Sequence, residues 1–258
     1  MPTRSKSSVE TVFDELIVGD VPLFIHPAWA DGFPWLLQGT SGAGPPNEPF
    51  DLALFGDHES AGVRERWDGV AAASGFHRVV HSRQPHGCNV HVHSEGPPGF
   101  AVVPPSDGHA SRTPGVLMAI AVADCVPVFL VDPSRRAVAL LHAGWRGVAA
   151  GILERGLQVL CQQMASRTGD VHMHLGPAIC GSCYEVGSEV FEALHLAAPG
   201  ERGDLDLRTA LVARAVRADV GRDRISVSGH CTRCDGSPFF SHRAGDPQRQ
   251  AAFLGVKP

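Results

Sequence analysis

Hydrophobic positions recur at two different spacings along the chain, one typical of strands and one typical of a helix. Residues 116–122 are almost all apolar, which favours a strand buried on both faces. Apolar residues at 148, 149, 152, 153, 156, 157, 160 and 164 follow one face of an α-helix, which we predict to begin near residues 145–147. A second helix is predicted over residues 59–74. The predicted strands cover residues 78–82, 116–122, 126–131, 137–141 and 225–228.

The order of these segments predicts an α+β fold of mixed sheets packed with helices. Residues 1–20 are interpreted as a weakly ordered tail with one short amphipathic stretch, and residues 21–258 as a single domain. Residues 39–49 are rich in Gly and Pro and predict a loop. Residues 97–114 are a second such stretch, but we do not interpret them as a domain boundary.

A thiol and an imidazole are predicted to meet at the open end of one hairpin. Residues 132–135 (Asp-Pro-Ser-Arg) favour a tight turn between two strands. If Pro133 and Ser134 form the loop, residues whose numbers sum to 267 lie opposite each other, as Cys125 and His142 do. Opposed residues have Cβ atoms roughly 5 Å apart. The pair is therefore either a nucleophile with its base or two ligands of one metal.

The segment that follows His142 predicts an anion site beside this pair. Gly144 allows a tight turn, and the predicted helix begins near Arg146. Free backbone N–H groups and the positive end of the helix dipole favour anions there. The alternative is that Arg146 only makes a local cap or salt bridge.

Composition excludes several classes of function. The formal net charge of −5 argues against a nucleic-acid or membrane-surface partner. No stretch approaches the roughly 20 apolar residues of a membrane span, and the polar first ten residues do not resemble a signal peptide. Seven cysteines in 258 residues fit reduced thiols, so a cytoplasmic location is expected. The sequence does not indicate an oligomeric state.

Several short motifs occur in the order typical of one bacterial family. The chain resembles the laccase-like family, once called multicopper polyphenol oxidoreductases and now regarded as zinc-dependent purine nucleoside phosphorylases, with some members described as peptidoglycan editing factors. The most specific motif is His-Ala-Gly-Trp-Arg-Gly at 142–147. The others are Ala-Asp-Cys at 123–125, Leu-Gly-Pro-Ala-Ile at 175–179, Cys-Tyr-Glu-Val-Gly at 183–187, Cys-Thr at 231–232 and Phe-Phe-Ser-His-Arg at 239–243.

The resemblance implies the roles of particular residues. His86, in Gln-Pro-His-Gly, matches a metal-binding histidine, so the implied Zn²⁺ ligands are His86, Cys125 and His142. Two imidazoles and a thiolate suit zinc and leave one position open. Cys125, His142 and Arg243 are the implied catalytic residues. Arg243 and Arg146 are the implied substrate-binding residues, because a guanidinium can hold phosphate by two bonds.

Three positions depart from the family pattern. Ala53 stands where the family has an asparagine, His242 where it has a tyrosine, and Ala244 where a second arginine is frequent. These departures allow a shifted substrate preference or a partial loss of activity.

Other histidine and cysteine pairs have ordinary explanations. Residues 91–93 and 172–174 each read His-x-His, which places two imidazoles on one face of a strand. We interpret both as structural. Residues 180–183 and 231–234 each read Cys-x-x-Cys, which we interpret as plain thiols, with a four-cysteine zinc site and a redox disulfide as alternatives.

The predicted function is phosphorolysis of purine nucleosides (adenosine, inosine, guanosine and S-methyl-5'-thioadenosine), with deamination of adenosine as a companion activity. The substrates would be purine nucleosides and inorganic phosphate. By resemblance, the fold is a layered sandwich similar to that of toxin-type cysteine hydrolases. Two alternatives remain: a metal-free Cys125–His142 hydrolase, and a non-catalytic protein that binds or edits peptidoglycan precursors.

Overall fold

The computed structural model describes residues 9–17, 19, 21–55 and 62–258. Within these residues two seven-stranded sheets and one two-stranded sheet form. The first sheet has the order β1 (Glu10–Val12), β15 (Ile225–Ser228), β12 (His172–Leu175), β10 (Val126–Asp132), β11 (Ala137–Ala143), β8 (Gly108–Ser111) and β6 (Val90–His93). The second has the order β2 (Glu15–Ile17), β3 (Leu23–Ile25), β4 (Leu36–Ser41), β16 (Gln250–Val256), β9 (Val116–Val122), β5 (Arg78–Ser82) and β7 (Gly99–Val103).

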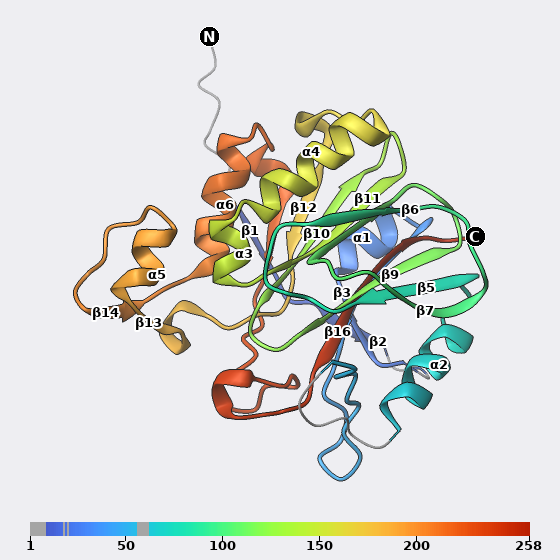
Figure 1. Cartoon of the computed structure of the whole chain (residues 1–258), viewed down its shortest axis with the longest axis horizontal. Helices are drawn as coiled ribbons and strands as arrows, with labels where there is room; N and C mark the ends of the chain where they lie inside the picture. Colours follow the sequence, from blue (N-terminus) through green and yellow to red (C-terminus); the bar gives the residue numbers. More distant parts are fainter. Residues whose placement is uncertain (1–8, 18, 20, 56–61) are drawn as a thin grey trace.

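Most helices cover the outer faces of the two sheets, but the first helix places Trp29 in the apolar cluster between them. The helices are α1 (Pro27–Gly32), α2 (Val63–Ala73), α3 (Trp145–Ala149), α4 (Ile152–Met164), α5 (Ser188–Ala193) and α6 (Leu207–Arg217). Figure 1 shows α4 and α6 on one side of the strands and α2 on the other. The small hairpin of β13 (Glu185–Gly187) and β14 (Arg202–Asp204) projects with α5 from one end. The chain is thus an α+β layered sandwich with mixed sheets.

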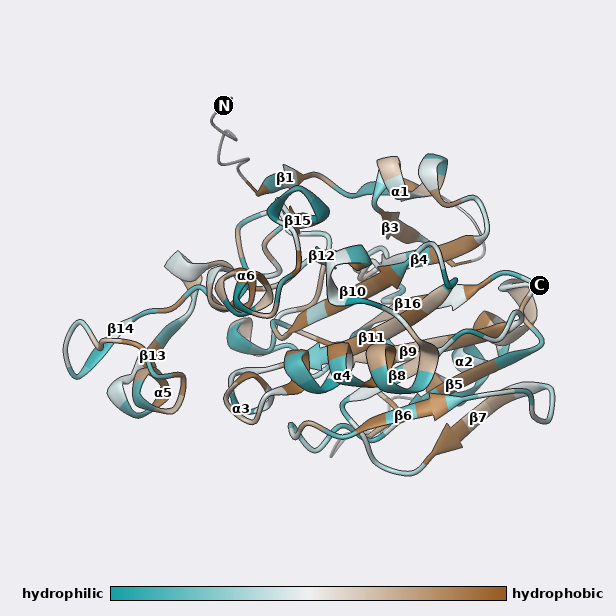
Figure 2. Cartoon of the chain, turned by 90° about the horizontal axis from the view of Figure 1, so that it is seen from above, coloured by the Kyte–Doolittle hydropathy of each residue, from teal (hydrophilic) through white to brown (hydrophobic). Residues whose placement is uncertain are grey.

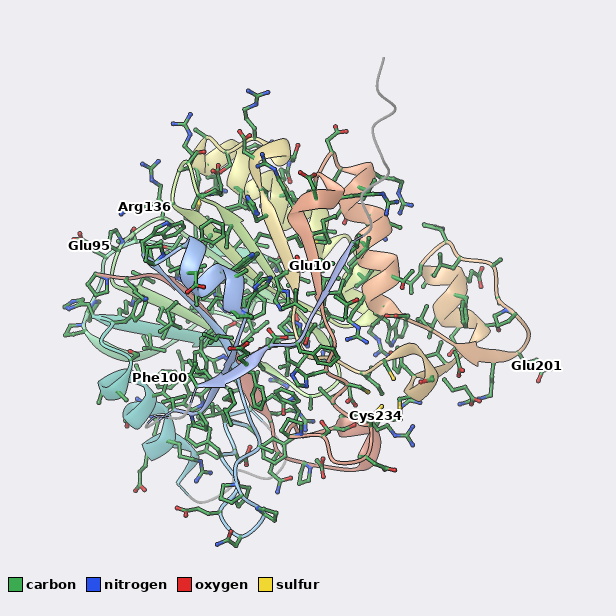
Figure 3. The ribbon with its side chains drawn as sticks, turned by 180° about the vertical axis from the view of Figure 1, so that it is seen from behind. Glu10, Glu95, Phe100, Arg136, Glu201 and Cys234 are labelled. Carbon is green, nitrogen blue, oxygen red and sulfur yellow. The ribbon has the colours of Figure 1, made fainter. Side chains whose placement is uncertain are left out.

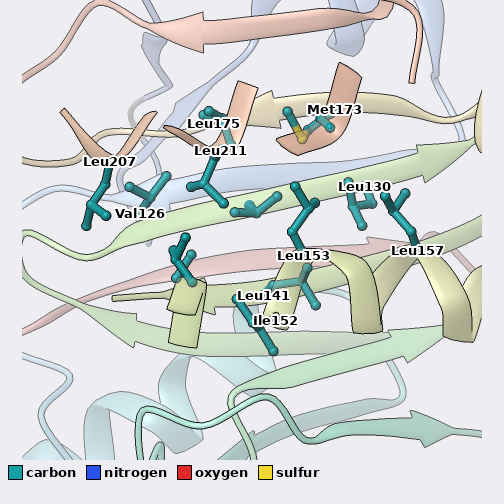
Figure 4. Packing of buried hydrophobic residues seen from close by; sticks show 14 of the residues in the cluster. Val126, Leu130, Leu141, Ile152, Leu153, Leu157, Met173, Leu175, Leu207 and Leu211 are labelled. Carbon is teal, nitrogen blue, oxygen red and sulfur yellow. The ribbon is translucent and has the colours of Figure 1, made fainter. Parts of the chain in front are cut away.

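The central hairpin β10–β11 is buried on both faces because both faces have an apolar partner. Leu130 and Leu141 pack against α4 on the outer face, together with Leu153 (Figure 4). Phe129 and Leu140, which have the opposite parity, pack against the second sheet. Figure 2 shows hydrophobic residues along these strands and their neighbours in both sheets. This parity also assigns Cys125 and His142 to the face between the sheets.

The second sheet has its own apolar cover. Trp67 of α2 is fully buried and stacks on the rings of His81 and Phe100, at 4.7 Å between centroids in each case. Its indole N–H donates to the carbonyl of Leu52. The helix therefore fixes the loop that contains Leu52, which leads to the site described below.

Several predicted elements are confirmed. The strands at 78–82, 116–122 and 225–228 have the predicted bounds, and the hairpin strands extend the predicted ones by one and two residues. Helix α2 begins at Val63, and residues 59–61 of the predicted helix lie outside the described residues.

Other predictions were wrong in part. The helix predicted from about 145 to 164 is two helices, because Gly151 has φ +87° and interrupts the backbone bonding between α3 and α4. Residues 39–41, predicted as loop, belong to β4, and the stretch 97–114 contains β7 and β8. The described part of the predicted tail contains β1 and β2, which pair with β15 and β3, so it belongs to the sheets.

Candidate metal centre

Cys125 and His142 meet at one end of the central hairpin, but not in the predicted register. The residue numbers of each pair in this hairpin sum to 269, not to the predicted 267. Asp132 pairs with Ala137, and the loop between them has four residues. His142 pairs with Pro127, and Cys125 lies level with Gly144, one position beyond the ladder. The two functional side chains are therefore diagonal neighbours on one face, a separation that a thiol and an imidazole can bridge.

Gly144 leaves the space in which these side chains meet. A Cβ atom at this position would lie 2.9 Å from the Sγ of Cys125 and 3.1 Å from the Cδ2 of His86. Contacts this short are incompatible with normal packing, so any side chain at Gly144 would displace one of the two groups.

His86 completes a group of three donors. It follows β5 in a loop and has φ +63°, a conformation uncommon for residues other than Gly. The donor atoms of His86, Cys125 and His142 all lie within 4.8 Å of one another. His142 is buried, Cys125 is partly buried and His86 is exposed, so the group is open to solvent on the His86 side.

A buried carboxylate, Asp107, holds two of these residues in place. Its Oδ1 accepts hydrogen bonds from the backbone N–H of His86 and from the Nδ1 of His142, both at 2.9 Å. Its Oδ2 accepts a bond from the N–H of Gly87 at 2.6 Å. An Nδ1–H donated to Asp107 leaves the Nε2 of His142 free to accept a proton or bind a metal. Asp107 was not predicted, because it lies in the Gly/Pro-rich stretch without a recognised motif.

The charges of the group favour a thiolate. Burial raises the pKa of Cys125, but the charge of His142 and hydrogen bonds from both histidines lower it to about 6. Burial lowers the pKa of His142, while the thiolate of Cys125 and the Asp107 carboxylate raise it to about 9. A thiolate is the form of cysteine that attacks electrophiles and binds metals.

A cavity of about 770 Å³ opens beside the three donors. Its wall includes the three donor residues, the side chains of Arg83 and Arg249, and Phe55, which is 45% exposed. Its other lining residues are Ala53, Leu54, His81, Gln84, Pro85, Pro105, Ala121, Ala123, His242 and Pro247. Two positions that depart from the family pattern, 53 and 242, therefore lie in this wall.

The two arginines of the wall differ in how they are held. The Nη1 of Arg249 donates to the backbone carbonyls of Asp246, Pro247 and Gln248, between 2.7 and 3.1 Å, so its guanidinium has a fixed position. Arg83 is exposed, and its guanidinium makes no hydrogen bond or ion pair with the described residues, while its backbone carbonyl accepts the N–H of Ser106 at 3.0 Å. Neither residue was predicted as part of the site, although Arg83 directly precedes the Gln-Pro-His-Gly motif.

The two predicted substrate-binding arginines lie near Tyr184 instead. The Cζ of Arg243 is 5.0 Å from the centre of the Tyr184 ring, and its Nη1 donates to the carbonyl of Glu185 at 2.8 Å. Arg146 stacks on Trp145 at 4.3 Å. Burial, with the negative charge of Cys125, raises the pKa of Tyr184 to about 12, although Arg243 and Arg146 lower it. Both arginines thus lie near the Cys125 side of the centre, but neither lines the 770 Å³ cavity.

Asp124 orders the chain around the thiol. It has φ +81°, and its Oδ1 accepts a hydrogen bond from the Oγ1 of Thr232 at 2.6 Å. Its Oδ2 accepts the backbone N–H of Arg243 at 2.7 Å. The Ala-Asp-Cys motif and the two late motifs are therefore joined by one carboxylate.

The histidine pairs interpreted as structural lie apart from this centre. His174 bonds to Asp14 through Nε2 and to Ser226 through Nδ1. The Nε2 of His93 bonds to the Nδ1 of His109 at 2.9 Å. Among the described residues only two groups of three or more metal-donor side chains come together, the centre above and a cluster of four cysteines, and neither contains a His-x-His pair.

Fold and centre together define a class of protein, an α+β sandwich with a two-histidine, one-cysteine group beside a polar cavity, which could hold a metal. The chain belongs to the family described as multi-copper polyphenol oxidoreductase laccase, whose model matches residues 38–257. Within the described residues no helix is long and apolar enough to cross a membrane.

Known proteins resemble the chain in sequence and in fold. The purine nucleoside phosphorylase YlmD of Geobacillus stearothermophilus is 35% identical over 69% of this chain and 72% of its own. An adenosine deaminase from an unknown prokaryotic organism is 34% identical over 69% of this chain and 74% of its own. The crystal structure of YlmD from G. stearothermophilus superposes with a TM-score of 0.84 at 27% identity, covering 96% of this chain and all (100%) of that one.

Proposed function

We propose that the protein is a zinc-dependent purine nucleoside phosphorylase that also deaminates adenosine. The observation that carries this proposal is the group of His86, Cys125 and His142 at the wall of a cavity large enough for a nucleoside. The names of the relatives supply the reaction classes, since one is called a purine nucleoside phosphorylase and another an adenosine deaminase.

The donor set fits zinc better than a multicopper arrangement. Two imidazoles and one thiolate make a borderline-soft set of three protein ligands, which is typical of catalytic zinc. Multicopper chemistry needs several His-rich sites, and one histidine of each His-x-His pair, His93 and His174, already bonds to another side chain. Zinc bound here would act as a Lewis acid and would lower the pKa of water for deamination.

The protein residues would do the remaining work by position and charge. Asp107 holds His142 in one orientation through Nδ1. Phe55 offers an exposed ring to the flat face of a purine. Phosphate would be oriented toward the sugar by guanidinium groups, either Arg243 with Arg146 or Arg83 with Arg249. Inosine, guanosine and S-methyl-5'-thioadenosine are the other proposed substrates, and the proposed location is the cytoplasm.

A second candidate is favoured by the charges of the centre. A thiol with a pKa of about 6 beside an imidazole with a pKa of about 9 is also the arrangement of a cysteine nucleophile and its base. Such a metal-free hydrolase would cleave or deamidate amides.

One experiment separates these candidates. Metal content and phosphate-dependent release of adenine from adenosine are measured on the same preparation, before and after exhaustive chelation. The proposal expects adenine release that requires phosphate, disappears with the metal and returns with added zinc. Cys125→Ala should lose both the activity and the metal of this centre. Amide hydrolysis that survives chelation would favour the metal-free enzyme, and intact nucleosides with zinc-loaded protein would contradict both enzymes.

A further inference from the structure

Four cysteines from two distant segments meet at the surface near the projecting hairpin. Cys180 directly precedes a single 3₁₀ turn, Gly181–Cys183, and Cys183 ends it, while Cys231 and Cys234 follow β15. Their four Sγ atoms all lie within 4.8 Å of one another. Figure 3 labels Cys234 on the side of the molecule from which β13, β14 and α5 project.

The distances between the sulfur atoms fit a shared cation and exclude a formed disulfide. Cys234 Sγ lies 3.9 Å from that of Cys180 and 3.8 Å from that of Cys183. Four sulfurs bound tetrahedrally to zinc at about 2.3 Å stand about 3.8 Å from one another. A disulfide requires about 2.05 Å, and all four thiols are free.

Backbone hydrogen bonds hold the two cysteine-containing segments together, and backbone N–H groups donate to one of the sulfur atoms. Ala178 and Cys231 form a parallel bridge, and the N–H of Thr232 donates to the carbonyl of Ala178. The Sγ of Cys231 accepts the backbone N–H of Cys180 at 3.2 Å and that of Arg233 at 3.4 Å. Donors of this kind stabilise a thiolate. The cluster is therefore a built arrangement rather than a chance approach of side chains.

We propose that Cys180, Cys183, Cys231 and Cys234 bind a second metal ion, a structural Zn²⁺, separate from the centre at Cys125. Four thiolates in tetrahedral positions are the donor set of structural zinc. They leave no open position for a substrate, so this ion would act on folding and position rather than on chemistry. The assignment replaces the interpretation of the two Cys-x-x-Cys pairs as plain thiols.

The ion would fix one flank of the first centre. Thr232, between the second pair of cysteines, donates to Asp124, the residue before Cys125. Tyr184 directly follows Cys183, and its ring lies against Arg243. The second site would therefore hold in place the segments that contact Asp124 and Arg243, without itself touching the cavity.

The test counts metal ions in the full-length protein and its variants. Wild-type protein, purified without chelator, is expected to contain about two zinc ions per chain. The double variant Cys183→Ser/Cys234→Ser and the single variant Cys125→Ala should each contain about one. The double variant replaces two sulfurs at the rim of the cluster and keeps Cys231, which accepts the backbone bonds. Cys161→Ser, which removes a thiol of α4 outside both groups, is the matched control and should keep both ions.

Cobalt substitution gives a readout that does not depend on activity or on the stability of a variant. Co²⁺ in wild-type protein should show the intense visible bands of a tetrahedral four-thiolate site. Cys125→Ala should keep these bands, and the double variant, if it folds, should lose them. One zinc ion in wild-type protein that disappears entirely in Cys125→Ala would overturn the proposal. So would an intact mass and thiol count that show a disulfide among the four cysteines of freshly prepared protein.

Discussion

Asp107 is the residue on which the geometry of the first centre depends most. Its two oxygens receive the imidazole of His142 and the backbone N–H groups of His86 and Gly87, and the side chain is fully buried. A carboxylate in this position fixes the orientation of a ligand and increases its basicity. Nothing in the surrounding sequence distinguishes Asp107 from a turn residue, because its partners come from segments far away in the chain.

Asp107→Asn should therefore weaken metal binding at this centre while the fold persists. The amide nitrogen would face groups that also donate, so at least one of the three bonds is lost. We expect the affinity for zinc to fall about 10- to 100-fold, measured by competition with a chromophoric chelator. Asp132→Asn is the control, because Asp132 is equally buried but caps the hairpin turn. An unchanged affinity in Asp107→Asn would contradict the role proposed here.

Substitutions in the two pairs of arginines, Arg243 with Arg146 and Arg83 with Arg249, would distinguish which pair binds phosphate. If Arg243 holds phosphate, Arg243→Lys should raise the apparent KM for phosphate roughly tenfold, since an ammonium cannot reproduce the planar fork. Deamination of adenosine, which uses no phosphate, should suffer less, and zinc content should stay the same. Arg83→Lys is the comparison from the cavity wall. A larger rise in the KM for phosphate in Arg83→Lys would assign phosphate to the cavity, and equal losses in both reactions would make Arg243 a structural or nucleoside-binding residue.

Among the strands and helices, the central hairpin shows which features the residue pattern predicts and which it does not. The strands, the turn and the meeting of Cys125 with His142 were predicted, but the register was wrong by two. Asp-Pro favoured a two-residue loop, whereas Arg136 takes φ +47° and the loop has four residues. A shift of two keeps every side chain on its predicted face, because side chains alternate with a period of two. The predicted meeting of Cys125 with His142 is therefore found despite the wrong register.

The break between α3 and α4 could not be predicted from the residue pattern, because the apolar spacing continues through it. A glycine inside a helix and a glycine at a break give the same pattern, and only the backbone distinguishes them. Gly151 has φ +87°, where a Cβ atom causes strain, while Gly69 lies inside α2 with open space around it.

Gly151→Ala and Gly69→Ala should consequently change the free energy of unfolding in opposite directions. We expect Gly151→Ala to lower it by roughly 1 kcal/mol or more, because alanine disfavours positive φ. Gly69→Ala should raise it by about 0.5–1 kcal/mol, as for any exposed position inside a helix. Urea denaturation followed by circular dichroism measures both. Stabilisation by Gly151→Ala would mean that α3 and α4 join in solution.

At the scale of the whole molecule, the chain buries several imidazoles between and beneath its sheets. Burial is the main cause that lowers the pKa of His26, His81 and His93 to about 4 and that of His109 well below its usual value. A neutral imidazole buried in the fold binds a proton less readily than the same group in the unfolded chain, whose pKa is near 6.5.

Stability should accordingly fall as the pH drops from about 6.5 to 4. In this range the unfolded chain binds protons that the folded chain does not, so each such histidine lowers the free energy of unfolding by about 1.4 kcal/mol per pH unit. Urea denaturation at several pH values measures the slope. His109→Gln should reduce it, while His195→Gln, which removes an exposed imidazole, should leave it unchanged. A flat profile between pH 6.5 and 4 would contradict this account.

The arrangement of the layers is the part of the fold that residue patterns predicted least. Spacing located most of the central strands, but it could not pair β16 with β4 and β9, which lie more than a hundred residues away in sequence. The edge strands near the N-terminus were missed because each has only three residues. Three of the predicted site residues, His86, Cys125 and His142, come together in the folded chain. Asp107, Arg83 and Arg249 also lie near this centre, but their positions in the sequence do not indicate it.

The four-residue loop of the central hairpin also has a practical consequence for handling the protein. Ser134, Arg135 and Arg136 are exposed, and a strand of seven residues separates this loop from the end that carries His142. Exposed loop tips of this kind tolerate insertions, because few contacts are lost there. A fluorescent label, an affinity tag or a short reporter peptide placed between Ser134 and Arg135 would leave the donor groups undisturbed. The protein could then be followed or immobilised through the end of the hairpin opposite His142.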